Sequence, residues 1–426
     1  MAPMERQPLK RCRISDQQKR RELALRRQSV NRRDSQLHAR RLASALLDNS
    51  PPPQETLTLI SQPEIQQEEI EELVVEESGE VSSHKGIDVL EASKLRGSKA
   101  RHWFSKQLML PEWMIDVPSR LSHDWYVLPR PAGKRCLVVS SNGTTVSRLR
   151  NGSILHHFPS SLPNGARIKD IAGPAHMYCI LDCIFHEPDQ TYYVIDMICW
   201  KGYSLYDCSS EFRFFWVNSK LTETGACDTP SFYHKYRFSL VPVYHCDQMG
   251  LQAAYEGNSP FSKDGLLFYN KHAHYHTGIT PLALVWKDMN CSQYFLDTDS
   301  NGVIPAQQQV VLELKEDGKV GSSDDPSVVF SCLDRDFLQQ KNLQPGALLR
   351  FAIGDGGLNI FDGKLDMADT NYIGKANRAR VSADSYNKVL FQYLARRSPL
   401  RIEDLVASIN SSQDGMDVVM EVSTYS

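Results

Sequence analysis

The sequence lacks the features that define a disulfide-stabilised or membrane-spanning protein. Its ten cysteines include no CxxC pair and no regular spacing, as is typical of reduced thiols. No run approaches the ~18 apolar residues that a spanning helix needs, and the N-terminal residues contain no apolar core of a secretory signal. Hydrophobic residues make up 41% of the 426-residue chain, which is typical of a globular protein. We therefore expect a soluble intracellular protein with no membrane partner.

Charge is distributed unevenly along the chain, although the net charge is only −3. Residues 1–44 contain thirteen Lys and Arg against four Asp and Glu. From Leu42 to His84 there is no Lys or Arg, while Glu is frequent. A segment with such a like-charge excess and few aromatic residues cannot bury enough apolar surface to order itself. We predict a basic arm over residues 1–47 and a disordered acidic linker over residues 48–98.

The basic arm has the local signals of a helix. Ser15 and Gln18 form a potential capping box, and neither Pro nor Gly interrupts residues 15–47. Its apolar stripe is incomplete, so we expect a helix that is stable mainly when it is bound. An acidic protein and a nucleic acid would both suit such an arm, and a solvated charged surface is the plainer interpretation.

From Trp103 onward the composition is globular. Short apolar runs rich in β-branched and aromatic residues recur, and turn signals such as Asn142-Gly143 separate several of them. The predicted strands of this largely antiparallel domain, which we place at 101–290, are 135–140, 177–185, 191–200, 211–217, 265–269 and 282–287. Further strands are predicted at 309–315, 328–333 and 347–353, with helices at 385–396 and 401–409. The overall class is α+β, ending in a disordered tail at 410–426.

The order of motifs in 125–290 resembles the nucleotidyltransferase fold of messenger-RNA capping enzymes and nucleic-acid ligases. The K-x-D-G-x-R loop of that family aligns with residues 130–135, where Arg130 takes the nucleophile position and Ala132 the Asp position. The remaining family motifs D-G-E, E-G-L and K-W-K align with residues 182–184, 264–266 and 285–287. Chemistry at phosphorus needs a nucleophile and a metal-holding carboxylate, and arginine stays protonated. The resemblance therefore implies a retained pocket without catalytic residues, cofactor or metal.

Residues 101–290 also resemble the snurportin family of nuclear-import adaptors. The matching runs are 107–118, 133–135, 180–184, 190–194 and 264–269, and in the arm residues 38–43 match the importin-β-binding helix of the family. This resemblance implies binding to the 2,2,7-trimethylguanosine cap of spliceosomal small nuclear RNA and its ribonucleoprotein. It also implies capture of the arm by importin-β, return by an exportin, and shuttling between nucleus and cytoplasm.

The snurportin resemblance assigns roles to individual residues. Trp286 corresponds to the tryptophan that stacks on the cationic methylated base, and Trp113 to the one that meets its methylated amino group. The implied cap-binding set is Trp286, Trp113, Lys134, Arg135, Cys136, Arg150, Pro111, Arg130 and Lys287. The implied importin-binding set is Arg20, Arg21, Arg26, Arg27, Arg32, Arg33, His38, Arg40, Arg41 and Leu42. Pro111 and Arg130 replace small residues of the family, and one residue is inserted before Trp286.

Residues 291–409 are similar to the oligonucleotide-binding (OB) barrel and terminal helices that follow the K-W-K motif in capping enzymes. The terminal motif of those enzymes aligns with residues 380–383, again without its catalytic residues. The sequence leaves two other functions open: an active RNA guanylyltransferase or ligase, and an RNA-binding protein that does not recognise a cap.

Overall fold

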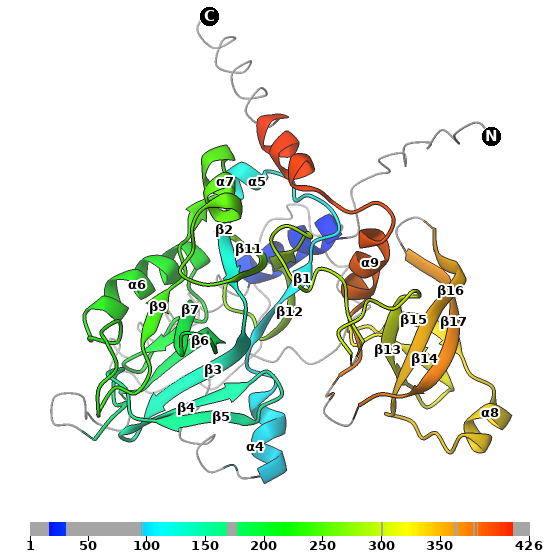
Figure 1. Ribbon diagram of the computed structural model, residues 1–426, viewed down its shortest axis with the longest axis horizontal. Coiled ribbons are helices and arrows are strands. Elements are labelled where there is room, and N and C mark those ends of the chain that lie inside the picture. Colours follow the sequence, from blue (N-terminus) through cyan, green and yellow to red (C-terminus); the bar gives the residue numbers. More distant parts are fainter. Residues whose placement is uncertain are drawn as a thin grey trace, which may run out of the picture. The chain divides into compact units, whose positions relative to one another are not determined.

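The computed structural model describes residues 17–30, 95, 97–167, 177–299, 301–361, 364–377, 380 and 382–411. The chain divides into one unit made of Met1–Arg26 with Arg96–Ser426, and a second unit, Arg27–Leu95. The described residues of the first unit form three β-sheets and the helices that cover them (Figure 1). The predicted linker up to residue 94 and the tail from residue 412 lie outside the described residues.

The first sheet has the strand order β1-β12-β11-β2-β10, in which β1 is parallel to β12 and the other pairs are antiparallel. Its strands are β1 Met109–Trp113, β12 Gly278–Trp286, β11 Lys263–Asn270, β2 Trp125–Pro131 and β10 Tyr244–His245. Side chains alternate between the two faces of a strand. One face, including Trp125, Phe268 and Trp286, packs in a core with Leu405 and Ile409 from near the end of the chain. Helices α5 (Leu121–Asp124) and α7 (Gln248–Glu256) contribute Leu121, Leu251 and Ala254 to the same core.

The second sheet has the order β5-β4-β3-β6-β7-β8, and β9 pairs with β7. Its strands are β5 Ile154–Phe158, β4 Thr144–Leu149, β3 Lys134–Ser141, β6 Cys179–His186, β7 Thr191–Trp200, β8 Tyr203–Ser204 and β9 Phe238–Leu240. Every residue of β6 and β7 is buried. The predicted turn at Asn142-Gly143 joins β3 to β4 with φ angles of 53° and 74°. Two successive positive φ angles characterise the tight hairpin turn for which Asn-Gly is preferred.

The strand predicted at 211–217 is wrong, because these residues belong to helix α6, Ser210–Thr222. Ser209 caps the helix by accepting a hydrogen bond from the Phe212 backbone N–H at 3.3 Å. Arg213, Phe214, Val217 and Leu221 are buried at the spacing of one helical face, while Phe215 is 71% exposed. The aromatic residues favoured a strand in the sequence, but their burial follows the helical period. Figure 1 shows α6 beside β7 and β9.

The third sheet is antiparallel, with the order β15-β14-β13-β16-β17. Its strands are β15 Val329–Cys332, β14 Lys319–Gly321, β13 Gln309–Leu314, β16 Leu348–Phe361 and β17 Lys364–Lys375. The edge strands approach each other, since Thr370 Oγ1 donates to Ser331 Oγ at 2.8 Å. Helices α8 (Arg335–Gln340) and α9 (Tyr386–Ala395) accompany this sheet, and a further helix covers residues 402–411.

The predicted α+β class with mainly antiparallel sheets is confirmed. Of the basic arm, residues 17–30 form a helix, and α4 (Gly97–Phe104) precedes the first strand. Among the residues that the structure describes, no helix is both long enough and apolar enough to cross a membrane.

Candidate functional site

The first polar cluster joins β3 and β6 of the second sheet to β1 of the first. Arg135 donates to both carboxylate oxygens of Asp182, at 3.0 and 2.7 Å, and to the Met109 carbonyl at 2.8 Å. Tyr275 donates to the same carboxylate at 2.8 Å and accepts from the Met109 N–H at 3.0 Å. Burial alone would lower the pKa of Arg135, but the Asp182 carboxylate outweighs it and raises that pKa. This cluster holds Arg135 rigidly on the side of β3 that faces the first sheet.

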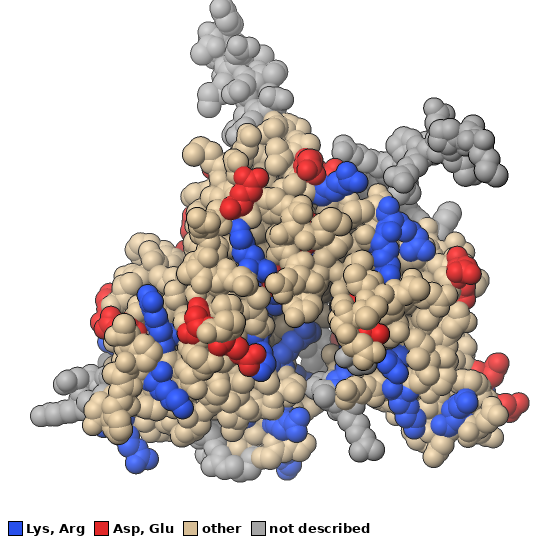
Figure 2. Space-filling view, viewed as in Figure 1, with Lys and Arg blue, Asp and Glu red and all other residues tan. Residues whose placement is uncertain are grey.

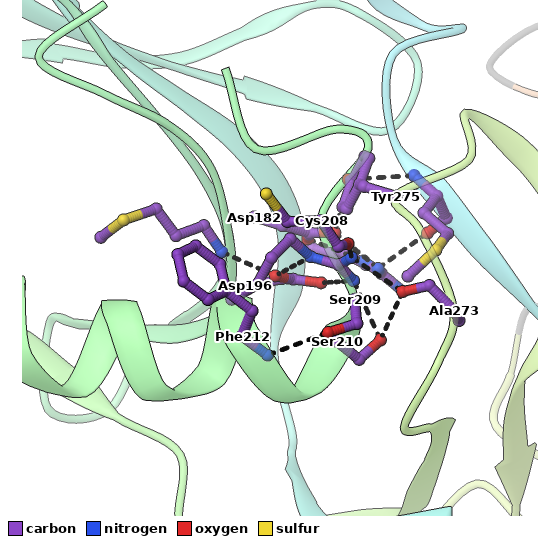
Figure 3. Close-up of polar contacts among 12 residues, drawn as sticks. Asp182, Asp196, Cys208, Ser209, Ser210, Phe212, Ala273 and Tyr275 are labelled. Atoms are coloured by element: carbon purple, nitrogen blue, oxygen red, sulfur yellow. Dashed lines mark hydrogen bonds and ion pairs between the residues drawn. The ribbon is translucent and has the colours of Figure 1, made fainter. Parts of the chain in front are cut away.

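A second buried ion pair lies next to the first. Arg213 donates to the two oxygens of Asp196 at 2.9 and 2.8 Å, and both side chains are fully buried. Figure 3 shows Asp196 beside the start of α6, where Arg213 also donates to the carbonyls of Cys208 and Ala273. The guanidinium lies 5.6 Å from the ring centre of Tyr275, which connects the two ion pairs. The two ion pairs thus form one polar network, which this cation–π contact joins.

The third cluster surrounds Asp264 at the start of β11. Lys287 donates to Asp264 at 2.6 Å, and Arg130 and Ser292 bind the same carboxylate. Burial opposes ionisation of Asp264, but Arg130 and Lys287 outweigh it and lower its pKa. Burial and the neighbouring Arg130 lower the pKa of Lys287. The predicted nucleophile position, Arg130, is therefore held by an ion pair.

Trp113 is half-buried at the end of β1, where it pairs with Val285 of β12. Its ring centre lies 4.8 Å from that of Phe391 in α9, with the planes tilted by 47°. The Lys287 ammonium lies 5.7 Å from the ring centre of Trp113. Lys287 and Phe391 also line a cavity of about 880 Å³ together with Leu400. The structure thus brings together Trp113, Lys287 and Arg130 of the predicted cap-binding set.

The second predicted tryptophan, Trp286, does not join this group. It is fully buried in the core on the opposite face of the first sheet, and its indole N–H donates to the Leu400 carbonyl at 3.0 Å. Consecutive strand residues point to opposite faces, so the side chain of Lys287 lies on the other face. In this structure Trp286 has no exposed ring face, and stacking on a base would require the segment around Leu400 to move.

The other predicted cap-binding residues are dispersed. Cys136 is buried in the core behind the second sheet, and exposed Lys134 pairs with Glu187 at 2.6 Å. Pro111 is half-buried in β1. Arg150 follows β4, is reached by solvent, and forms no ion pair with the residues that the structure describes. Partial desolvation, together with the positive charges of Arg135 and Arg380, lowers the pKa of Arg150.

Two residues of the predicted importin-binding set contact the start of the globular part. Arg20 pairs with Glu112 at 3.0 Å, and Arg21, which is 2% exposed, pairs with Asp116 at 3.0 Å. Gln17 donates to Glu112 at 2.9 Å and to the Trp113 carbonyl at 3.0 Å. Arg26 and Arg27 lie on the same helix. The remaining members of the set, Arg32, Arg33, His38, Arg40, Arg41 and Leu42, lie outside the described residues.

The sequence did not identify Asp196, Arg213 and Tyr275 as members of the polar network. The available signal was weak: Asp182 and Asp196 are single charges within otherwise apolar strands. A buried charge needs a partner, so such a position predicts an ion pair, but the partner itself is set by the fold.

The part of the chain that contains the first and second sheets, which we call the two-sheet region, is similar to a known family. A family model described as Snurportin1, m3G cap-binding domain, matches residues 107–287. Among solved structures, a mycobacterial DNA ligase D complexed with ATP and MES has 9% identity and a TM-score of 0.32, covering 66% of this chain and 99% of that chain. The ligase domain of LigD from M. tuberculosis has 11% identity and a TM-score of 0.31, covering 66% and 97%.

Proposed function

We propose that the protein binds the trimethylguanosine cap of small nuclear RNA as a non-catalytic adaptor, because residues 107–287 match a family model described as Snurportin1, m3G cap-binding domain. The observation that carries the proposal is the family match over residues 107–287, which include Trp113, Arg130 and Lys287. A methylated guanine is cationic and favours an aromatic face, and the phosphates that follow it need cations. Trp113, with Lys287 and Arg130 close by, supplies both kinds of group.

The ion pairs of Arg130 and of the buried carboxylates support the proposal that the protein does not transfer nucleotides. Arginine is a poor nucleophile because it stays protonated, and Arg130 is also bound to Asp264. The carboxylates of Asp182, Asp196 and Asp264 each bind a guanidinium or an ammonium group. A metal ion would have to displace these cations before it could assist chemistry at phosphorus.

The adaptor part of the proposal concerns the arm. Its helix carries basic residues suited to an acidic receptor such as importin-β, which would deliver the protein and its ribonucleoprotein cargo to the nucleus. An exportin would return it to the cytoplasm. Arg20 and Arg21 pair with Glu112 and Asp116 in the free protein. To capture the helix, importin-β must therefore bind it more strongly than these intramolecular ion pairs do. The arm would gain the necessary contacts by folding as it binds.

The test is competition for a fluorescent capped oligonucleotide by free trimethylguanosine and monomethylguanosine cap dinucleotides. We expect the trimethylated cap to compete at much lower concentration, because an apolar wall favours a dimethylated amine over an NH₂ that would lose its hydrogen bonds. Trp113→Ala should abolish this binding, Trp113→Phe should retain part of it, and Phe215→Ala, which removes an aromatic ring that is 71% exposed, should change nothing. Equal competition by the two caps would support cap-independent RNA binding instead.

The active-enzyme alternative is tested separately. Incubation with labelled GTP or ATP and magnesium would leave a covalent nucleotide on a guanylyltransferase or ligase. We expect no labelled protein after denaturing electrophoresis, and a labelled band that resists boiling would overturn the binding-only proposal.

A further inference from the structure

A second basic site lies on the third sheet, beyond the family match. Three exposed cations, Arg350, Lys375 and Arg380, line a cavity of about 350 Å³ on the side of β13, β16 and β17. Arg350 stands in β16 directly across from Val311 of β13, and Lys375 ends β17 across from Leu349. The side chains of Leu349 and Phe351 face the core of this sheet. Since side chains alternate along a strand, Arg350 lies on its outer face.

The cations of this site exceed the carboxylates that neutralise them. Within the described residues, Arg350 and Lys375 form no ion pair, and Lys375 donates only to the Asn342 carbonyl at 3.2 Å. Arg380 pairs with Asp384, a carboxylate that is 6% exposed and also binds Lys388 at 3.0 Å. The Val311 N–H donates to the other oxygen of Asp384 at 2.9 Å. Asp384 therefore fixes Arg380 in place but leaves the site with a positive surplus.

Arg380 connects this basic site to the two-sheet region. Its charge, with that of Arg135, acts on Arg150, the cation after β4 that has no ion-pair partner among the described residues. Arg350, Lys375 and Arg380 line one cavity, and the charge of Arg380 also acts on Arg150. We call these four residues the basic track. Figure 2 shows Lys and Arg side chains, and also Asp and Glu side chains, over the part of the surface where Figure 1 places the third sheet.

The composition of the track favours a polyanion over a protein surface. A protein interface normally has an apolar centre, whereas Val311 and Ala376 are the only apolar residues that line this cavity within the described part of the chain. Cations without carboxylate partners are suited to phosphates, whose binding releases counterions. We propose that Arg150, Arg380, Arg350 and Lys375 bind the phosphate backbone of the RNA that follows the cap, so that the third sheet extends the cap site into a single-stranded RNA site. The direction of the RNA rests on the proposed cap-binding function, but the basic site itself does not.

The test compares a trimethylguanosine cap dinucleotide, a capped 12-nucleotide RNA and the same RNA without a cap, over a series of salt concentrations. The variant Arg350→Gln/Lys375→Gln removes two cations from the track. Lys319→Gln/Lys341→Gln removes the same charge from exposed positions of the same region that do not line the cavity. Circular dichroism and thermal unfolding establish that both variants fold.

We expect the wild-type protein to bind the capped RNA more tightly than the dinucleotide. The Arg350→Gln/Lys375→Gln variant should bind the dinucleotide normally but the capped RNA roughly tenfold more weakly, with a salt dependence shallower by about 1.4 in log–log slope. The Lys319→Gln/Lys341→Gln control should match the wild type.

The proposal would be overturned if the two variants bound the capped RNA with equal affinity, or if the wild-type protein bound the capped RNA no more tightly than the dinucleotide. If the wild-type protein did not bind the cap dinucleotide, the proposed cap function would be wrong, and binding of the uncapped RNA would still test the track. Displacement of RNA by polyglutamate at equal charge concentration would favour an acidic protein instead and would also overturn it.

Discussion

Trp286 provides a decisive test because its two assigned roles predict opposite results. The snurportin resemblance makes it the stacking residue, whereas the structure places it in the core with a hydrogen bond to the Leu400 carbonyl. Replacing a fully buried aromatic residue by alanine costs about 3–5 kcal/mol, because the transfer free energy is lost and a cavity is left. Trp286→Phe keeps most of the apolar area and leaves the carbonyl without its donor, which costs about 1–3 kcal/mol.

The assay measures two quantities on each variant. Urea unfolding followed by far-ultraviolet circular dichroism gives the stability, and titration with a fluorescent trimethylguanosine cap gives the affinity of the folded fraction. We expect Trp286→Phe to lower stability and to retain cap affinity within about twofold. We expect Trp113→Ala, at a half-buried position, to lower stability less and to abolish binding. If Trp286→Phe left stability unchanged and greatly weakened cap binding, the core assignment of Trp286 would be refuted and the stacking role supported.

Two further predictions follow from the ion pairs. The cations Arg130 and Lys287 hold the pKa of Asp264 below its unfolded value, so its stabilising effect is present at neutral pH and is lost as pH falls through that lowered pKa. Asp264→Asn should therefore be less stable than the wild type at pH 7, and the difference should shrink below about pH 4 in thermal unfolding; a constant difference across this range would contradict the pairing. Asp116→Asn removes the partner of buried Arg21 and should strengthen importin-β binding several-fold in a pull-down titration, whereas Asp124→Asn, which breaks an exposed pair, should not.

Sequence patterns predicted most strands of the two-sheet region correctly, but they did not predict the contacts between separate elements. The apolar runs that became β3, β6, β7, β11 and β12 are buried as expected for strands between two layers. The segment 211–217 failed because its aromatic residues suit both strand and helix, and the burial period decides between them only after folding. The partner of Asp182 lies 47 residues away, and the two cations that bind Asp264 lie 23 and 134 residues away, so none of these ion pairs has a local signal.

The orientation of Trp286 shows how a single position limits inference from a motif. Neighbouring strand residues point to opposite sides, so a shift of one residue in the match to the motif exchanges the faces assigned to Trp286 and to its neighbour. In this structure Lys287, which follows β12, binds Asp264, and Trp286 packs in the core of the first sheet. The letters of the motif therefore do not decide on which face the tryptophan ring lies.

The family match ends at residue 287, yet the folded unit does not. The core behind the first sheet is completed by Leu405 and Ile409, and the only indole donor bond of Trp286 in the described residues goes to Leu400. At the pocket side, Phe391 of α9 packs on Trp113, and Asn387 of the same helix contacts Arg20 of the arm. Removing residues 291–411 would therefore expose a large apolar surface on the first sheet and would leave Trp113 without its aromatic neighbour. The core of the first sheet, the surroundings of Trp113 and the contacts of Arg20 therefore all depend on residues beyond the end of the family match.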